Sequence, residues 1–168
     1  MDNFDLKLYL KNNPLLTEGI DLPSTYGPER EKEYEKVLQR QIQDYIEGGS
    51  EGHLNLYNTP ITSLPDNLTR VGGDLYLEDT LITSLPDNLE VSGYLSLNNT
   101  QITSLPNNLK VGGDLYLNNT PIASLPDNLE VGRDLWLSNT PLSQKYTRKE
   151  IRKMIEDKGG YVKEGIYL

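Results

Sequence analysis

The sequence contains no cysteine, which excludes disulfides, thiolate nucleophiles and zinc–thiolate sites. Histidine occurs once, as His53, so a metal site built from several histidines is also excluded. Phenylalanine occurs once as well, and the hydrophobic fraction of 36% is low for a globular protein. A chain built of repeats tolerates this composition, because each repeat needs only a thin apolar spine. We expect neither a metal ion nor another cofactor.

Basic residues are scarce in the middle of the chain. Residues 51–142 carry eleven acids and three bases, whereas residues 143–168 carry four acids and seven bases. The acidic middle disfavours nucleic acid as a partner, because phosphate binding needs clustered Lys and Arg, and it favours a partner with a basic surface. No apolar run approaches membrane-spanning length, and the first ten residues contain acids where a secretory signal has bases. These features predict a cytoplasmic protein with no membrane partner.

The central feature of the sequence is a phrase of about twenty residues that recurs almost five times between Leu54 and Leu142. Its copies open at intervals of 20 or 21 residues, at Leu54, Leu75, Leu95, Leu115 and Leu135. The phrase reads L-x-L-x-x-T-x-I-T-S-L-P-D-N-L-x-V-G-G. A fixed period of this length is typical of a solenoid.

Each copy divides into a strand and a return path. The L-x-L segment alternates apolar with polar residues, which predicts a short strand, and stacked copies would form a parallel sheet of about five strands. The S-L-P-D-N-L segment predicts an extended or polyproline-like return with a tight turn, because proline fixes its own φ and favours extended geometry before it. Six positions in a copy are expected to face inward, namely Leu75, Leu77, Ile82, Leu85, Leu89 and Val91.

The two ends do not repeat. Residues 1–50 are expected to form an N-terminal helical cap, with a short helix over residues 4–10, a loop over 14–27 and an amphipathic helix that starts at Pro28 and stops at Gly48-Gly49. Residues 143–168 are expected to form a C-terminal cap, with a helix that starts at the capping box Thr147–Glu150 and a strand pair or extended tail over 161–168. The predicted domains are thus 1–50, 51–142 and 143–168.

The segments LYLEDTLITSLPDNL, LSLNNTQITSLPNNL and LYLNNTPIASLPDNL resemble short bacterial-type leucine-rich repeats, which share the core L-x-L-x-x-N-x-L-T-x-L-P. One departure is consistent, because threonine stands where the family has asparagine, at Thr59, Thr80, Thr100, Thr120 and Thr140. Similar threonine-type repeats occur in phage and environmental bacterial proteins. The resemblance implies an α/β leucine-rich-repeat solenoid with its parallel sheet on the concave face, where members of the family usually bind their ligands.

The outward residues of the L-x-L strands should form columns on that face. Aromatic and acidic residues gather in these columns, and the candidate binding residues are Tyr57, Asp74, Tyr76, Glu78, Tyr94, Asp114, Tyr116, Asp134 and Trp136. Tyrosine and tryptophan supply large contact areas at low entropic cost and dominate binding hot spots. Aromatic residues also favour strands for structural reasons alone.

Three functions follow from these columns. The favoured hypothesis is a non-catalytic module that binds a protein on the concave face; if phage-encoded, it would act on a host protein, in the host cytoplasm or as part of the virion. The second is recognition of a carbohydrate or a surface receptor. The third is glycoside hydrolysis by Asp114 and Asp134, whose spacing of about one strand is near that of the paired carboxylates of retaining enzymes. An open sheet offers nothing to raise the pKa of one acid, so we expect no enzyme.

Overall fold

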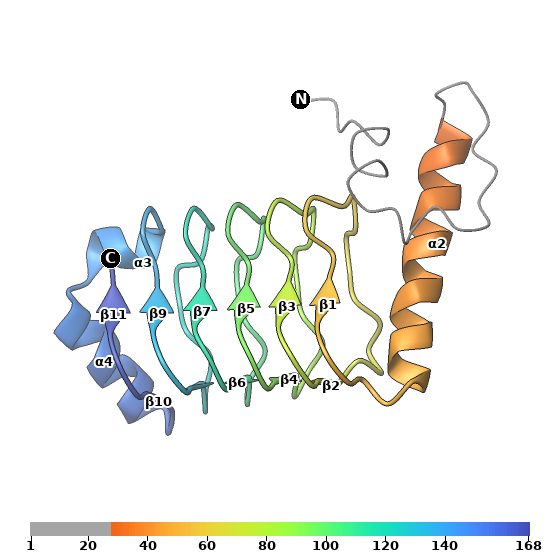
Figure 1. Ribbon diagram of the computed structural model, residues 1–168. Helices are drawn as coiled ribbons and strands as arrows, with labels where there is room; N and C mark the ends of the chain where they lie inside the picture. Colours follow the sequence, from red (N-terminus) through yellow and green to blue (C-terminus); the bar gives the residue numbers. More distant parts are fainter. Residues whose placement is uncertain (1–27) are drawn as a thin grey trace.

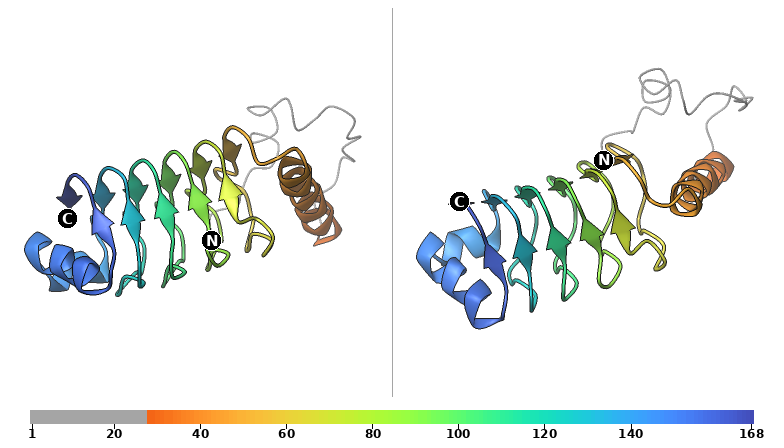
Figure 2. Two further views of the ribbon diagram at one scale, coloured as in Figure 1. Left: turned by 90° about the horizontal axis from the view of Figure 1, so that it is seen from below. Right: turned by 60° about the horizontal axis from the view of Figure 1, so that its bottom comes forward.

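The computed structural model describes the backbone of residues 28–168 and the side chains from residue 35 onward. The helix expected at residues 4–10 and the loop expected at 14–27 lie outside this range. The described chain winds into coils that stack side by side, with one strand of each coil in each of two parallel sheets (Figures 1 and 2). The expectation of a repeat solenoid is confirmed at this level. No helix in residues 28–168 combines the length and apolarity needed to span a bilayer.

The first sheet, here called sheet A, contains the L-x-L segments. Its six strands lie in the order β1 (Leu54–Asn55), β3 (Leu75–Tyr76), β5 (Leu95–Ser96), β7 (Leu115–Tyr116), β9 (Leu135–Trp136) and β11 (Ile166–Tyr167). Neighbouring strands pair in register, with each leucine opposite the leucine of the next copy. The five expected strands are present, and β11 adds a sixth.

The second sheet, sheet B, was not expected. It consists of β2 (Arg70–Val71), β4 (Glu90–Val91), β6 (Lys110–Val111), β8 (Glu130–Val131) and β10 (Tyr161–Val162). Each strand comprises two residues and lies just before the glycine-containing corner that leads into sheet A. A strand of two residues is too short to show alternating apolar and polar residues in the sequence. The sequence therefore predicted only an inward-facing valine followed by a turn at this segment.

The core is the narrow space between the two sheets and the return paths. The six inward positions expected in the second copy are all buried, at no more than 8% exposure. The return paths of the first four coils contain no helix and turn at the Asp-Asn or Asn-Asn pair, as predicted. The five threonines of the repeat are also buried, and each hydroxyl donates to the carbonyl of the leucine three residues earlier at 2.7–2.8 Å.

Asparagines at the turns tie successive coils together. Eight Asn or Asp residues in the coils have φ between 54° and 60°, a region that asparagine tolerates better than most residues. Their side-chain amides form ladders from one coil to the next; Asn119, for example, donates to Asn99 at 2.8 Å and accepts from Asn139 at 2.9 Å. A second ladder joins Asn88, Asn108 and Asn128. The repeated asparagines therefore serve both the turn and the stacking.

Helix α2 (Pro28–Glu47) lies at the N-terminal end of the stack (Figure 1). Its bounds agree with the predicted start at Pro28 and stop at Gly48-Gly49. Leu38 and Ile42 are buried at no more than 1% exposure. The Tyr45 hydroxyl donates to the Ser50 carbonyl at 2.8 Å and accepts the Gly72 N–H at 3.3 Å, which attaches the end of α2 to the first corner of the solenoid.

The C-terminal segment differs from the expected cap. Helices α3 (Pro141–Lys145) and α4 (Arg148–Asp157) replace the extended return path of the fifth coil, and the capping box Thr147–Glu150 is present. The expected strand pair is two strands that do not pair with each other, since β10 pairs with β8 and β11 pairs with β9. Both sheets therefore continue beyond Leu142. The interval from Leu135 to its partner Ile166 is 166 − 135 = 31 residues, because the helices lengthen this coil.

Candidate functional site: the outward face of sheet A

The candidate binding residues do share one face, because they occupy outward positions of the strands of sheet A or positions next to them. Tyr57 is 48% exposed, Asp114 is buried at 7% exposure, and the other seven are intermediate. They form three columns that cross the strands. Each column has a different set of contacts, and these contacts decide which side chains are available to a partner.

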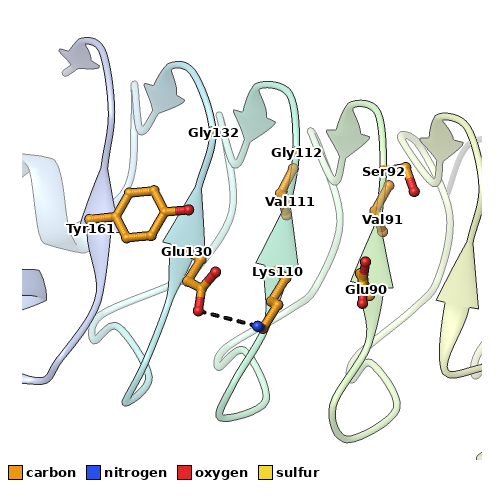
Figure 3. Close-up of a pocket in the computed structure, with 9 residues that line it drawn as sticks. All are labelled: Glu90, Val91, Ser92, Lys110, Val111, Gly112, Glu130, Gly132 and Tyr161. Carbon is orange, nitrogen blue, oxygen red and sulfur yellow. Dashed lines mark ion pairs between the residues drawn. The ribbon is translucent and has the colours of Figure 1, made fainter.

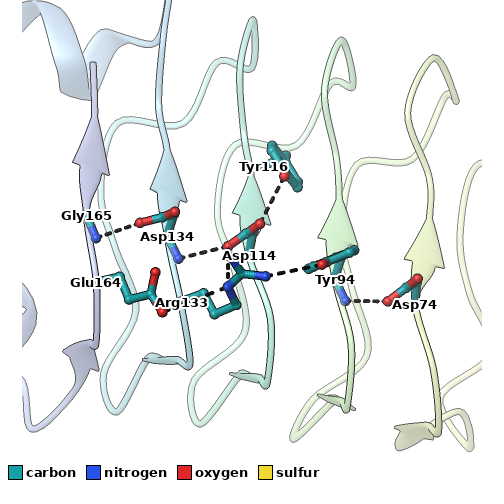
Figure 4. Close-up of polar contacts among 8 residues, drawn as sticks. All are labelled: Asp74, Tyr94, Asp114, Tyr116, Arg133, Asp134, Glu164 and Gly165. Carbon is teal, nitrogen blue, oxygen red and sulfur yellow. Dashed lines mark hydrogen bonds and ion pairs between the residues drawn. The ribbon is translucent and has the colours of Figure 1, made fainter.

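The acidic column is largely occupied by contacts between coils. The Tyr94 N–H donates to Asp74 at 2.8 Å, and the Asp134 N–H donates to Asp114 at 3.0 Å. Asp134 in turn accepts the Gly165 N–H at 2.6 Å. Figure 4 shows these carboxylates beside the backbone of the next strand. The aspartates therefore join coils, and they offer fewer free acceptor positions than the sequence suggested.

A basic residue missed by sequence reasoning lies against this column. Arg133 occupies a corner position where other copies have glycine, and its Nε lies 3.7 Å from Asp114 and 3.9 Å from Glu164 (Figure 4). Its guanidinium also donates to the Tyr94 hydroxyl at 3.3 Å, across two coils. Asp114 is the main cause of the raised pKa of Arg133, so the arginine stays charged. The sequence did mark this residue, because Arg133 replaces the second glycine of the Gly-Gly pair found in other copies.

The Tyr94 ring reaches Arg133 because Gly113 lies beneath it. A Cβ at Gly113 would lie 2.5 Å from the Tyr94 ring carbon Cδ1, so a larger residue there would displace the ring. In this coil the aromatic residue has moved into the acidic column, and Ser96 takes the usual aromatic position. The aromatic column is therefore interrupted between Tyr76 and Tyr116.

The aromatic column contains a stack over three neighbouring strands. The Tyr116 and Trp136 ring centroids lie 5.9 Å apart with planes at 17°, and those of Trp136 and Tyr167 lie 4.1 Å apart at 13°. Tyr167 was missed because it lies outside the regular period. The signal was present, since V-K-E-G-I-Y-L at 162–168 matches V-G-G-D-L-Y-L at 111–117.

Two tyrosine hydroxyls are held by the aspartates that immediately precede their strands. Tyr76 donates to Asp74 at 2.9 Å, and Tyr116 donates to Asp114 at 3.0 Å. Burial, followed by the hydrogen bond to Asp114, raises the pKa of Tyr116 to about 12. The hydrogen bond to Asp74 is the main cause of the raised pKa of Tyr76. Both phenols thus remain neutral near neutral pH, with their rings fixed against the sheet.

Two polar atoms on this face are buried without a hydrogen-bond partner in the described part of the chain, Glu78 Oε2 and Trp136 Nε1. Glu78 belongs to the third column, whose asparagines form another inter-coil ladder: Asn98 accepts the Asn118 N–H at 2.9 Å, and Asn118 accepts the Ser138 N–H at 2.8 Å. A buried carboxylate oxygen with no partner carries a desolvation cost that no contact in the described chain offsets.

The residues from 28 onward contain no group of three or more His, Asp or Glu side chains placed to hold a metal ion. Asp114 and Asp134 both accept backbone N–H groups, so the pair considered for glycoside hydrolysis is engaged in stacking the coils. Comparisons with protein-family models, with curated proteins and with solved structures return no match to this chain. Its function therefore has to be inferred from the side chains of the solenoid.

Proposed function

We propose that the protein is a non-catalytic binding module of the leucine-rich-repeat type and that it binds another protein on the outward face of sheet A. The observation that carries this proposal is the row formed by Tyr116, Trp136 and Tyr167. These rings lie outside the core, which the leucines, isoleucines and valines already fill. Large aromatic side chains held rigidly at a surface are typical of the energetic centre of a protein interface.

The packing of the rings favours a protein over a sugar on this face. Trp136 lies between two near-parallel tyrosine rings, so both faces of its indole are covered. Sugars usually need an open ring face, whereas a protein can use the edges together with the surrounding amides. The acidic side chains on this face, among them Glu78 two residues beyond Tyr76, support a partner with a basic surface.

Helices α2 and α4 fit the role of caps in this proposal. The buried residues Leu38 and Ile42 at one end, and Ile151 and Ile155 at the other, belong to the continuous core of the stack. Terminal caps with a polar outer side keep a solenoid soluble and leave its faces free for binding. The carboxylates Asp114 and Asp134 join coils in this proposal and have no catalytic role.

The test is capture of proteins from a bacterial lysate on the immobilised full chain. The chain itself carries serine at one aromatic position, Ser96, so the variant Tyr76→Ser, Tyr116→Ser, Trp136→Ser uses a residue that the fold already accepts. A matched control, Glu90→Ala, Lys110→Ala, Glu130→Ala, removes three outward side chains of sheet B. We expect a protein that binds the wild type and the control but not the serine variant. Equal capture by a folded serine variant would refute the proposal.

A further inference from the structure

The outward face of sheet B contains a depression that the proposed function does not use. It has a volume of about 410 Å³ and extends across β4, β6, β8 and β10 (Figure 3). Its walls include Glu90, Lys110, Glu130 and Tyr161, and its floor includes the corner residues that follow the strands. The depression is open to solvent over much of its extent, and its volume is large enough to admit a small ligand.

The depression exists because its floor lacks long side chains. A Cβ at Gly112 would collide with the carbonyl oxygen of Ser92, and a Cβ at Gly132 would collide with that of Gly112. The corners at Gly112 and Gly132 therefore stack closely because they lack a Cβ, whereas the equivalent residue of the second coil is Ser92. The floor is backbone and one serine, while long side chains rise from the adjacent strand positions.

The wall of the depression carries two acids and one base, Glu90, Glu130 and Lys110, whereas Arg70 lies outside it and within 3.9 Å of Glu51. The register of sheet B places Arg70, Glu90, Lys110 and Glu130 opposite one another on consecutive strands, with alternating sign. Lys110 Nζ lies 3.4 Å from Glu130 Oε1. The depression has no excess positive charge to hold an anion, and its wall offers hydrogen-bond acceptors on either side of a donor, about 4.8 Å apart. That pattern suits a neutral ligand with many hydroxyl groups.

An exposed tyrosine stands at one end of the depression. Tyr161 follows Glu130 in the register and is 47% exposed. Figure 3 shows its ring directed from β10 towards Glu130. Within residues 28–168 its hydroxyl makes no hydrogen bond and its ring contacts no other ring. Trp136 on sheet A differs in this respect, because tyrosines cover both of its faces.

From this combination we infer that the depression on sheet B binds a short neutral glycan of about two sugar units. One sugar stacks on the Tyr161 ring through its apolar face, and the hydroxyls of the other bond to Lys110 and the two glutamates. The site is separate from the proposed protein-binding face. It requires no chemical step, and loss of either site leaves the other intact.

The test is titration of the ¹⁵N-labelled full chain with maltose, cellobiose, lactose and N,N′-diacetylchitobiose. We expect at least one disaccharide to give saturable shifts of the Ser92, Gly112 and Gly132 amides, with a dissociation constant of roughly 1–10 mM. Tyr161→Val, which removes the ring but keeps a residue that favours strands, should weaken binding at least tenfold. Tyr167→Ala, on sheet A, should leave it unchanged.

Three outcomes would overturn the inference. The first is the absence of saturable shifts at these amides with all four disaccharides. The second is full binding by Tyr161→Val, or an equal loss in Tyr167→Ala. The third is a response of these amides to hexa-arginine but to none of the sugars, which would assign the depression to a cationic ligand. Far-UV circular dichroism of each variant shows that the fold is retained, and Tyr161→Ser replaces Tyr161→Val if the latter unfolds.

Discussion

Trp136 stacks on Tyr167 with 4.1 Å between ring centroids and 13° between ring planes, although 31 residues separate their strands in the chain. This contact joins the last strand of sheet A to the regular coils. It also places the single tryptophan of the protein between two tyrosines. Tryptophan fluorescence therefore reports on this stack alone.

We expect Tyr167→Ala to open one face of the Trp136 indole to water. The emission maximum of Trp136 should shift to longer wavelength, and the free energy of unfolding should fall by about 0.5–1.5 kcal/mol beyond the loss of buried area. Tyr161→Ala, which removes an exposed tyrosine from the neighbouring strand of sheet B, should leave the emission unchanged. Identical spectra for wild type and Tyr167→Ala would show that the two rings do not stack in solution.

The turn asparagines allow a second test, because each combines two roles. It adopts a positive φ at the turn, and its side chain hydrogen bonds to the equivalent asparagines of neighbouring coils. Asn119 has a φ of 58° and hydrogen bonds to the asparagines of both neighbouring coils. Asn119→Gly loses those bonds but tolerates the positive φ, whereas Asn119→Ala adds backbone strain of about 1–2 kcal/mol. We therefore expect alanine to destabilise more than glycine in urea unfolding. Ser124→Ala, at an exposed return-path position, is the control, and a glycine variant as unstable as alanine would contradict the role of φ.

The tyrosines of sheet A predict a loss of stability at high pH. Burial and the bond to Asp114 raise the pKa of Tyr116 from 10.0 to about 12, so the folded chain holds this proton more tightly than the unfolded chain. The resulting contribution to stability is complete below pH 10 and is lost as the pH rises from about 10 to about 12. Tyr116→Phe should flatten this fall when urea unfolding is measured across that range. The residual slope should include Tyr76, whose pKa is also raised. An unchanged slope in Tyr116→Phe would count against this assignment.

Arg152 protects an open sheet edge. Its two terminal guanidinium nitrogens donate to the Val162 and Glu164 carbonyls, each at 2.6 Å. Arg152→Ala leaves the part-buried Val162 carbonyl unpaired, so we expect a loss of about 1–3 kcal/mol and a greater tendency to associate through the edge. Urea unfolding and light scattering measure the two effects.

The neighbouring Lys153→Ala is the matched control for Arg152. Lys153 makes an exposed ion pair with Asp157 at 2.7 Å, and such pairs contribute little to stability because solvent screens them. If both alanine variants were equally stable and equally monomeric, the edge-protecting role of Arg152 would be wrong.

The sequence alone was enough to predict how each coil of the repeat is built. Residues that recur at a fixed interval in a stack occupy equivalent positions, so the inward leucines, the buried threonines and the turn asparagines of one copy predict those of the others. The columns of sheet A followed from the same regularity. The limits of α2 and the capping box of α4 were also readable, because proline, glycine and the Thr–Glu pair act locally.

Contacts made by residues that depart from the repeat could be found only in the tertiary structure. The helices of the fifth coil lengthen the interval to Tyr167, so no spacing rule placed its ring on Trp136. The strands of sheet B are too short to show an alternating pattern, and the contact of Arg133 with Tyr94 depends on the space above Gly113. The acidic column looked free in the sequence, yet its oxygens accept N–H groups of the next coil. A repeat specifies its own stacking because every copy packs against an equivalent copy. Residues that depart from the repeat have no such equivalent neighbour, so their contacts depend on the path of the whole chain.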